Sequence, residues 1–296
     1  MELRVLGYFL AVAREENFTR AAEQLHVTQP TLSRQIADLE TELGVKLFTR
    51  KNHSIVLTED GMLLKHRAQE ILSLVDRTKR DFLYKKEALQ GTITIGSGEF
   101  LSTGILTDCI AAFRKKYPLV RYEFYSGNAV NLKDSIERGL LDVGLMMEPV
   151  DIRKYEFLSM PIQEEWGALV REDSLLAEKD WITPENLVGI PVVAATSDIA
   201  QNTFGKWLGA QREKVDIIAT ENLLYNGAMF AQSNISAAIG IRLNCRYTGL
   251  KFLPFFPSLR TTTALAWKKE QIFSSATTAF LEFAKKYISS ITNDDR

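Results

Sequence analysis

The first clear pattern lies between residues 18 and 44, where apolar residues recur at helical spacing. This pattern predicts two short helices joined by a tight turn. Thr19 is placed to cap the first helix and Thr28 to cap the second, and Gly44 stands where the second should end. The second helix has one apolar stripe with steps of four, three and four residues, formed by Leu32, Ile36, Leu39 and Leu43.

A polar face lies opposite this stripe, near the N-terminus of the second helix. In a helix-turn-helix, this part of the second helix reaches base edges in the DNA major groove. Gln can pair with adenine and Arg with guanine, while Ser serves a base or a phosphate. The alternative is an ordinary amphipathic helix pair with a solvated face. The candidate DNA-binding residues on this face are Thr28, Gln29, Pro30, Thr31, Ser33 and Arg34.

The segments on either side extend this picture. Apolar residues at helical spacing over residues 3–13 predict a helix that covers the back of the pair. Residues 45–58 predict a short hairpin, or wing, with a polar tip that carries Arg50, Lys51 and His53. A basic tip beside a reading helix would contact phosphates or the minor groove. The alternative for the tip is a solvated surface turn.

The longest pattern runs from residue 59 to about residue 89, after Thr58 as its cap. Its 3.5-residue period is typical of a coiled-coil seam, and about 30 residues of helix would extend roughly 45 Å. We therefore expect a dimerisation helix, with packing on its own domain as the alternative. The seam positions are Leu64, Ala68, Ile71, Val75, Thr78, Phe82, Lys85 and Leu89.

From Gly91 onward, strand-like and helix-like segments alternate, which predicts an α/β fold with parallel strands and right-handed crossovers. The expected strands are 92–97, 120–125, 141–147, 166–170, 192–195, 215–219, 235–241 and 262–267. The expected helices are 103–117, 128–138, 199–208, 222–232 and 275–289.

Ligands of open α/β sheets bind at the carboxyl ends of the strands. Backbone N–H groups at these ends could hold a carboxylate, although each polar residue there could equally be a helix cap. Glu99, Glu148 and Asp198 lie near the same loops and would oppose an anion if they point inward, so the sign of the ligand charge stays open. The candidate ligand-binding residues are Ser97, Gly98, Phe100, Ser102, Thr103, Ser126, Gly127, Asn128, Ala195, Thr196 and Ser197.

The composition restricts the possible functions of the chain but does not identify one. The 296 residues carry a net charge of −1, and residues 1–60 hold seven Lys or Arg against nine Asp or Glu, so DNA binding would depend on arranged charge. We find no apolar run of about 18 residues and no signal-peptide pattern, and we expect a cytoplasmic protein that does not contact membranes. Cys109 and Cys245 are expected to be buried thiols.

Histidine usage weighs against an enzyme. The three histidines, His26, His53 and His66, all lie in the first 66 residues. A Ser-His-Asp site or a His-containing metal site within the rest of the chain is therefore excluded. No phosphate-binding loop is found either, and we expect no cofactor. A plain solute-binding module would be secreted, and neither an enzyme nor such a module explains the N-terminal pattern.

Residues 1–66 closely resemble the LysR-type transcriptional regulator family. The resemblance is carried by Phe9, Ala11-Val12-Ala13, Phe18-Thr19, Ala21-Ala22, Leu25-His26-Val27-Thr28-Gln29-Pro30, Leu32-Ser33, Ile36, Leu39-Glu40, Leu43-Gly44, Leu47-Phe48, Arg50, Leu57-Thr58 and Gly61. It implies a regulator that binds double-stranded DNA and responds to a small-molecule effector of unknown identity. It also implies a homodimer through the linker helix and, commonly, a homotetramer.

The same resemblance implies a domain plan. A winged helix-turn-helix would occupy residues 1–58, and a linker helix residues 59–90. Residues 91–296 would form an effector-binding domain of two α/β subdomains, similar to periplasmic binding proteins. Subdomain I would take 91–161 and 269–296, and subdomain II 162–268, with the chain crossing near Pro161-Ile162 and Lys268-Lys269. The effector would bind in the cleft between them.

Overall fold

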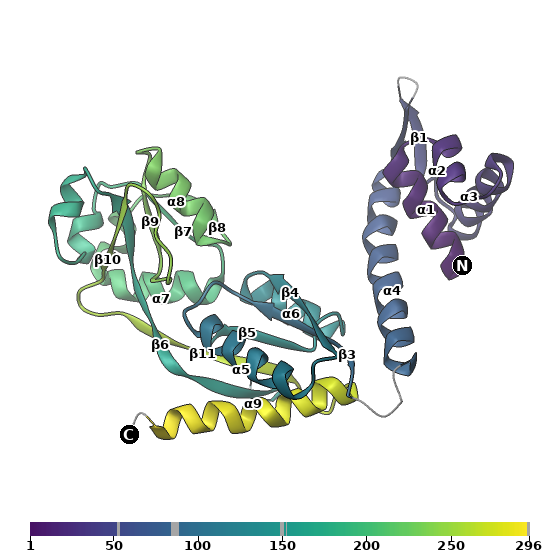
Figure 1. The fold of residues 1–296 in the computed structure, drawn as a ribbon. Coiled ribbons are helices and arrows are strands. Elements are labelled where there is room, and N and C mark those ends of the chain that lie inside the picture. The colour runs from purple at the N-terminus through teal and green to yellow at the C-terminus, as the bar shows by residue number, and fades with distance from the viewer. Residues whose placement is uncertain (52–53, 84–88, 149–150, 152, 295–296) are drawn as a thin grey trace. The chain divides into compact units, whose positions relative to one another are not determined.

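The computed structural model describes residues 1–51, 54–83, 89–148, 151 and 153–294. The chain divides into two compact units, Met1–Lys85 and Lys86–Arg296 (Figure 1). In the part described, no helix is both long enough and apolar enough to cross a membrane.

The N-terminal unit is the helix-turn-helix with a wing that the sequence predicted. Its elements are α1 (Leu3–Glu15), α2 (Phe18–Gln24), α3 (Gln29–Leu43), β1 (Phe48–Lys51), β2 (Ser54–Leu57) and α4 (Glu59–Leu83). The two strands pair antiparallel, with Phe48 opposite Leu57 and Lys51 opposite Ser54. The hairpin therefore lies within the range expected from the sequence.

The helix caps explain where α2 and α3 begin and end. The Thr28 hydroxyl accepts a hydrogen bond from the backbone of Thr31, and Gly44 ends α3 with a φ of 71°. The cap expected at Thr19 is wrong, because α2 starts earlier. The Asn17 side chain accepts hydrogen bonds from the backbone N–H groups of Thr19 and Arg20, at 2.8 and 3.1 Å. Asn is at least as good a cap as Thr, so the earlier residue holds the helix start.

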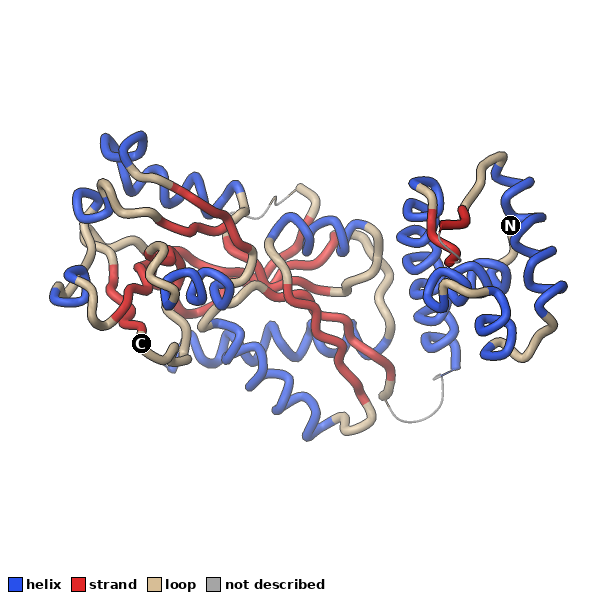
Figure 2. Tube along the Cα trace, turned by 90° about the horizontal axis from the view of Figure 1, so that it is seen from above, coloured by secondary structure: helices blue, strands red, loops and turns tan. Residues whose placement is uncertain are grey.

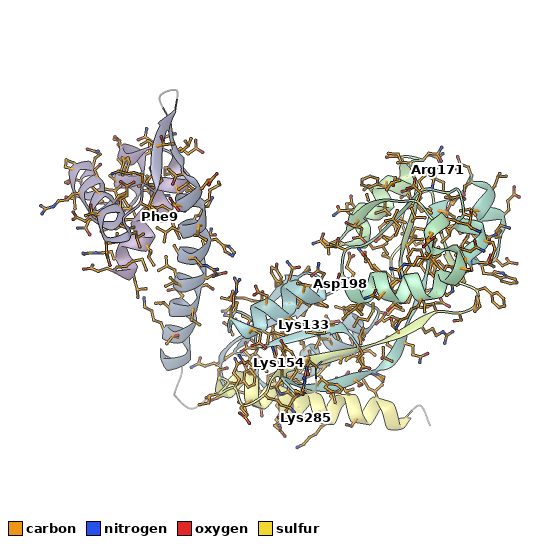
Figure 3. All side chains as sticks on the ribbon, turned by 180° about the vertical axis from the view of Figure 1, so that it is seen from behind. Phe9, Lys133, Lys154, Arg171, Asp198 and Lys285 are labelled. Atoms are coloured by element: carbon orange, nitrogen blue, oxygen red, sulfur yellow. The ribbon has the colours of Figure 1, made fainter. Side chains whose placement is uncertain are left out.

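The first half of α4 packs on its own domain. Ala68 is fully buried in the N-terminal core beside Phe9, and Leu64 and Ile71 pack partly against the same cluster. Figure 3 shows Phe9 inside this unit, among helices α1 to α4. The apolar stripe that predicted a dimer seam thus serves the core over these turns, which is the alternative that the sequence left open.

Two other features of α4 separate it from the expected seam. Leu89 lies outside the described helix and packs against the core of the C-terminal unit. Leu63 and Leu74 are 59% and 46% exposed and lie eleven residues apart, which is about three helical turns. They therefore form an exposed apolar line that differs from the buried stripe. The predicted seam positions Phe82 and Lys85 lie outside the described side chains.

The first subdomain of the C-terminal unit has a sheet in the order β4-β3-β5-β11, with the first three strands parallel. Helices α5 and α9 cover one face, where Phe113 and Phe280 meet edge to face, and α6 covers the other (Figures 1 and 2). The elements are β3 (Gly91–Ser97), α5 (Ser102–Lys116), β4 (Val120–Ser126), α6 (Ala129–Glu137), β5 (Val143–Met147), β11 (Arg260–Lys268) and α9 (Ser275–Asp294).

The second subdomain has a parallel core of β9, β7 and β8, to which β6 and β10 add antiparallel strands. Most elements fall near their expected ranges, but β10 was not expected. Its elements are β7 (Val192–Ala195), α7 (Asp198–Leu208), β8 (Ile217–Glu221), α8 (Leu224–Gln232), β9 (Ala237–Ile241), β10 (Leu250–Pro254) and short 3-10 turns at Leu175–Glu178, Pro184–Leu187 and Gly209–Lys214. Cys109 is buried as expected, but Cys245 is exposed.

The long strand β6 (Tyr155–Arg171) joins the two subdomains. Its first residues pair with β11 beside β5, and its last pair with β9 and β10. The boundary expected near Lys268-Lys269 is wrong, because Thr263 to Ala266 pair with β5 in the first sheet. The pairing between β11 and β6 is irregular between Thr262 and Ala264. The return crossing therefore lies at this irregularity, opposite the first crossing in β6.

Candidate functional site

Helix α3 presents its N-terminal polar residues to solvent. Leu32, Ile36 and Leu39 are buried, so the opposite face points outward. Of the predicted DNA-binding residues, all but Ser33 on this helix start are exposed: Thr28, Gln29, Pro30, Thr31 and Arg34. Pro30 lies in the first turn, where its missing N–H costs little. The helix start therefore offers a polar surface of the size and position expected for a reading helix.

The polar groups on this face hold one another weakly. Gln29 donates from Nε2 to the Ser33 hydroxyl at 2.7 Å, and Ser33 is half-buried. Arg34 approaches Asp38 at 4.0 Å, with both side chains mostly exposed. Exposed pairs of this kind contribute at most about 1 kcal/mol. The guanidinium can thus exchange Asp38 for another acceptor at little cost.

A buried carboxylate on α3 holds the start of the wing. Glu40 accepts hydrogen bonds from the backbone N–H groups of Leu47 and Phe48, at 2.9 and 3.3 Å, and from Lys46 Nζ at 2.6 Å. Burial raises the pKa of Glu40, but the Lys46 contact and the two backbone donors together leave that pKa below its ordinary value. Glu40 thereby joins the end of α3 to the base of β1.

The predicted wing-tip residues are only partly described. Arg50 and Lys51 lie at the end of β1, and their side chains are outside the described part. His53 lies outside the described residues altogether. Their role as phosphate contacts stays a prediction.

A cavity of about 100 Å³ lies between the two subdomains of the C-terminal unit. The first subdomain contributes the loop after β3, the start of α6 and the end of β5. The second contributes the ends of β7 and β8, the start of α7 and part of β9. Asp198 marks the start of α7 in Figure 3. The carboxyl ends of parallel strands meet here, which is where the sequence argument expected a ligand.

The cavity separates the predicted ligand-binding residues into two groups. Those that line it are Gly98, Phe100, Gly127, Asn128, Ala195 and Ser197. Those that do not are Ser97, Ser102, Thr103, Ser126 and Thr196. Ser97 and Thr103 face each other at 3.2 Å between hydroxyls, and the Thr196 hydroxyl donates to the Glu221 carbonyl at 2.9 Å.

Ser102 does not reach the cavity because its hydroxyl belongs to a buried network at the crossing strands. Glu164, which is fully buried, accepts from the backbone of Leu101 and Ser102 at 2.9 and 3.0 Å. The Ser102 hydroxyl donates to the same carboxylate at 2.6 Å and lies 2.7 Å from the Thr263 hydroxyl. Glu164 thus accepts hydrogen bonds from the backbone N–H groups at the start of α5. The network ties α5 to both crossing strands.

Two glutamates, Glu99 and Glu221, line the cavity. Glu99, on the loop after β3, accepts a hydrogen bond from the backbone N–H of Leu224 at the start of α8, across the cleft. Burial raises the pKa of Glu99 above its ordinary value. Burial and, secondarily, the charge of Glu99 raise the pKa of Glu221 to about 7. The other two acids named in the sequence analysis, Asp198 and Glu148, do not line the cavity. Glu148 instead accepts hydrogen bonds from Ser159 and Thr262.

Sequence reasoning found Ala195 and Ser197 but missed the rest of the second-subdomain wall of this cavity. Glu221 and Asn222 line it, and Glu221 lies directly beside Ala195 in the pairing of β8 with β7. The signal was the carboxyl end of β8, but the expected strand ended at residue 219, two residues early. The apolar lining contributed by Trp166 and Ile241 could not be assigned without knowing how β6 and β9 pair.

Comparison with known proteins identifies both units. Residues 3–62 match the family described as "Bacterial regulatory helix-turn-helix protein, lysR family". Residues 86–289 match the "LysR substrate binding domain". The chain belongs to the LysR family of bacterial transcriptional regulators. The resemblance found in the first 66 residues is thereby confirmed and extends over the C-terminal unit.

Full-length LysR-family relatives are similar along nearly the whole chain. The Hca operon transcriptional activator HcaR of Escherichia coli (strain K12) is 29% identical over 301 residues, covering 99% of this chain and all of that protein. An uncharacterised regulator, YybE of Bacillus subtilis (strain 168), is 27% identical over 297 residues, covering 98% of this chain and all of YybE. Both are named as transcriptional regulators rather than as enzymes.

Solved structures of LysR-family proteins share the fold. Full-length CbnR in complex with its target DNA has a TM-score of 0.75 at 21% identity, covering 97% of this chain and all of that one. Full-length BenM has a TM-score of 0.57 at 22% identity, covering all of this chain and 98% of BenM. At these identities the likeness concerns the fold, an N-terminal winged helix-turn-helix followed by an α/β domain.

Proposed function

We propose that this LysR-family regulator binds operator DNA through the start of α3 and the wing, and that a small molecule in the cleft between its subdomains controls it. The observation that carries the proposal is the combination in one chain of an exposed polar helix start and a cavity lined by both subdomains. The two features lie in different units, so one can serve as output and the other as input.

The DNA-binding proposal rests on Ser33 and Arg34. Replacing Arg34 with Ala removes a side chain able to pair with guanine, and we expect specific binding to weaken by about 1–3 kcal/mol. Ser33→Ala should weaken it less, because Ser33 also accepts from Gln29. The measurement is a gel shift on a site that the wild-type protein selects from random-sequence DNA. Arg114→Ala, an exposed arginine of α5, is the matched control. Unchanged affinity of both α3 variants would refute this assignment.

We further propose that α4 dimerises the chain and that dimers pair into tetramers. The exposed line of Leu63 and Leu74 supports this proposal better than the buried stripe, because Ile71 already packs against its own core. A charge at Ile71 would damage the fold as well as a dimer.

Leu74→Glu is therefore the better test of the dimer. A buried carboxylate at an apolar interface is costly, so we expect dissociation in sedimentation velocity at micromolar concentration. Gln69→Glu adds the same charge at an exposed position on a different face of α4 and should leave the sedimentation coefficient unchanged. If Leu74→Glu also leaves the assembly intact, α4 is not its dimer contact.

The mechanism we propose is a population shift. A ligand that contacts both walls of the cavity favours one closure of the subdomains, since it binds that closure more tightly. The strands that cross between the subdomains are held by the Glu164 network, so closure would be a movement around a fixed crossing. In the assembled regulator this movement would change the spacing of the DNA-binding units.

A further inference from the structure

The cavity between the subdomains has an apolar body and a negatively charged end. Aromatic and aliphatic side chains from both subdomains form most of its wall, including Phe100, Met147, Trp166, Ile199 and Ile241. Cavities of roughly 150 Å³ with such walls hold a benzene ring. A volume of about 100 Å³ therefore suits a small ligand with a short aliphatic chain or a single ring that fits after slight opening.

The charged end consists of Glu99 and Glu221, one from each subdomain. Glu221 receives a hydrogen bond from the backbone of Leu223, yet its Oε2 is buried without a hydrogen-bond partner. Among the described residues that line the cavity, none is Lys, Arg or His. A buried carboxylate oxygen without a donor is costly unless a partner arrives. Glu221, which lines the cavity, thus keeps one carboxylate oxygen without a partner.

Several of the groups that could hold an anion already have a partner. The Asn128 side chain accepts from the backbone of Val130 and Asn131 at the start of α6, and Ser197 accepts from Ala200 at the start of α7. Glu99 itself takes the backbone N–H of Leu224 at the start of α8. A carboxylate ligand would therefore meet two like charges and helix starts that are capped. The anion that the strand ends first suggested is disfavoured here.

We propose that the ligand of this cleft is a small amine, whose protonated nitrogen donates to Glu221 and Glu99 while its apolar part lies against Phe100 and Trp166. This inference rests on the proposed function of the cleft and names the chemical class of its effector. An ammonium group supplies three donors and a positive charge, and charge-assisted hydrogen bonds of this kind are about twice as strong as neutral ones. Because the two glutamates come from opposite subdomains, the amine would also hold the cleft closed.

The test is binding of matched small probes to the full-length protein at pH 8. Butylamine and benzylamine are compared with butanol and benzyl alcohol, and with butanoate and benzoate, by calorimetry and thermal shift. We expect each amine to bind at least tenfold more tightly than its alcohol, and the carboxylates to bind more weakly still. Glu221→Gln and Glu99→Gln should each weaken amine binding at least tenfold. Glu178→Gln, an exposed glutamate with the same change, should leave it unaltered.

Three results would overturn the amine assignment: carboxylates that bind as tightly as amines, amine binding that survives both Glu→Gln changes, or no binding by either amine. A crystal soaked with butylamine gives a readout that needs no variant, since the nitrogen should lie about 2.7–3.2 Å from Glu221 Oε2. Gel shifts with each probe separate this inference from the proposed function. A carboxylate that binds and alters DNA binding would keep the effector cleft and reject only the amine.

Discussion

Two glutamates, one in each unit, show how differently the molecule treats the same side chain. Glu40 in the N-terminal unit is surrounded by donors, namely Lys46 and the backbone of Leu47 and Phe48. Glu221 in the cleft accepts one backbone hydrogen bond, and its other carboxylate oxygen is buried without a partner. A second acidic side chain, Glu99, lies nearby. The pKa of the first is lowered and that of the second is raised.

The difference separates a carboxylate that is satisfied within the protein from one that is not. Glu164 belongs with Glu40, because three donors from Leu101 and Ser102 satisfy it completely within the protein. Evolved cores seldom leave a buried polar atom without a partner unless the site has another use. The contrast therefore places the unpartnered carboxylate in the lining of the cavity, and places the satisfied carboxylates where elements are joined.

The largest expected effect on the free energy of unfolding in this comparison comes from Glu40→Ala. The change leaves the backbone N–H of Leu47 buried without an acceptor and releases Lys46, so we expect a loss of about 1–3 kcal/mol at pH 7. Because the folded pKa lies below the ordinary value of 4.5, the contribution is present above pH 4.5 and fades as the pH falls through the folded pKa. Calorimetry at pH 7 and at pH 3.5 should show the gap between variant and wild type shrink.

The control for this change is Glu23→Ala, which removes an exposed glutamate of the neighbouring helix α2. It should alter the free energy of unfolding by about 0.5 kcal/mol or less. An equal loss in both variants, or a gap that does not depend on pH, would mean that Glu40 does not join α3 to the wing.

The same comparison explains what the sequence could predict. The α3 surface was read correctly in outline because its apolar stripe and both caps lie within seventeen residues, Thr28 to Gly44, and follow one period. The Asn17 cap was missed because Thr19 lies so close and has the same chemistry. Local rules suffice for an element whose exposed face is set by its own periodicity.

The cavity could be predicted only in part because its walls come from segments far apart in the chain. Gly98 and Asn128 follow strands whose ends were predicted well. Glu221 was missed because β8 ends two residues later than its apolar pattern indicated, and because its place beside Ala195 depends on strand pairing. Likewise, Ser102 has the right residue type for a ligand contact, but Glu164, more than sixty residues away, takes its hydroxyl.

The smallest expected effect on stability comes from Glu221→Gln, which should stabilise the protein rather than destabilise it. A folded pKa of about 7, raised by burial and by Glu99, means that the charged form is disfavoured in the folded protein. Ionisation of Glu221 therefore costs no stability below pH 4.5, and lowers wild-type stability progressively as the pH rises from 4.5 toward 7. The groups facing Glu221 are Glu99 and Tyr247, and Tyr247 stays neutral in this window because burial raises its pKa.

Replacing Glu221 with Gln removes this charge while keeping the shape, so the unliganded variant should be more stable than wild type at pH 8, by about 1 kcal/mol after solvent screening. At pH 4 the two proteins should unfold at nearly the same temperature. The measurement is thermal unfolding of the full chain across this range without added amine. A variant that is less stable than wild type at pH 8 would show that Glu221 is a structural carboxylate like Glu40, and the contrast between the two units would fail.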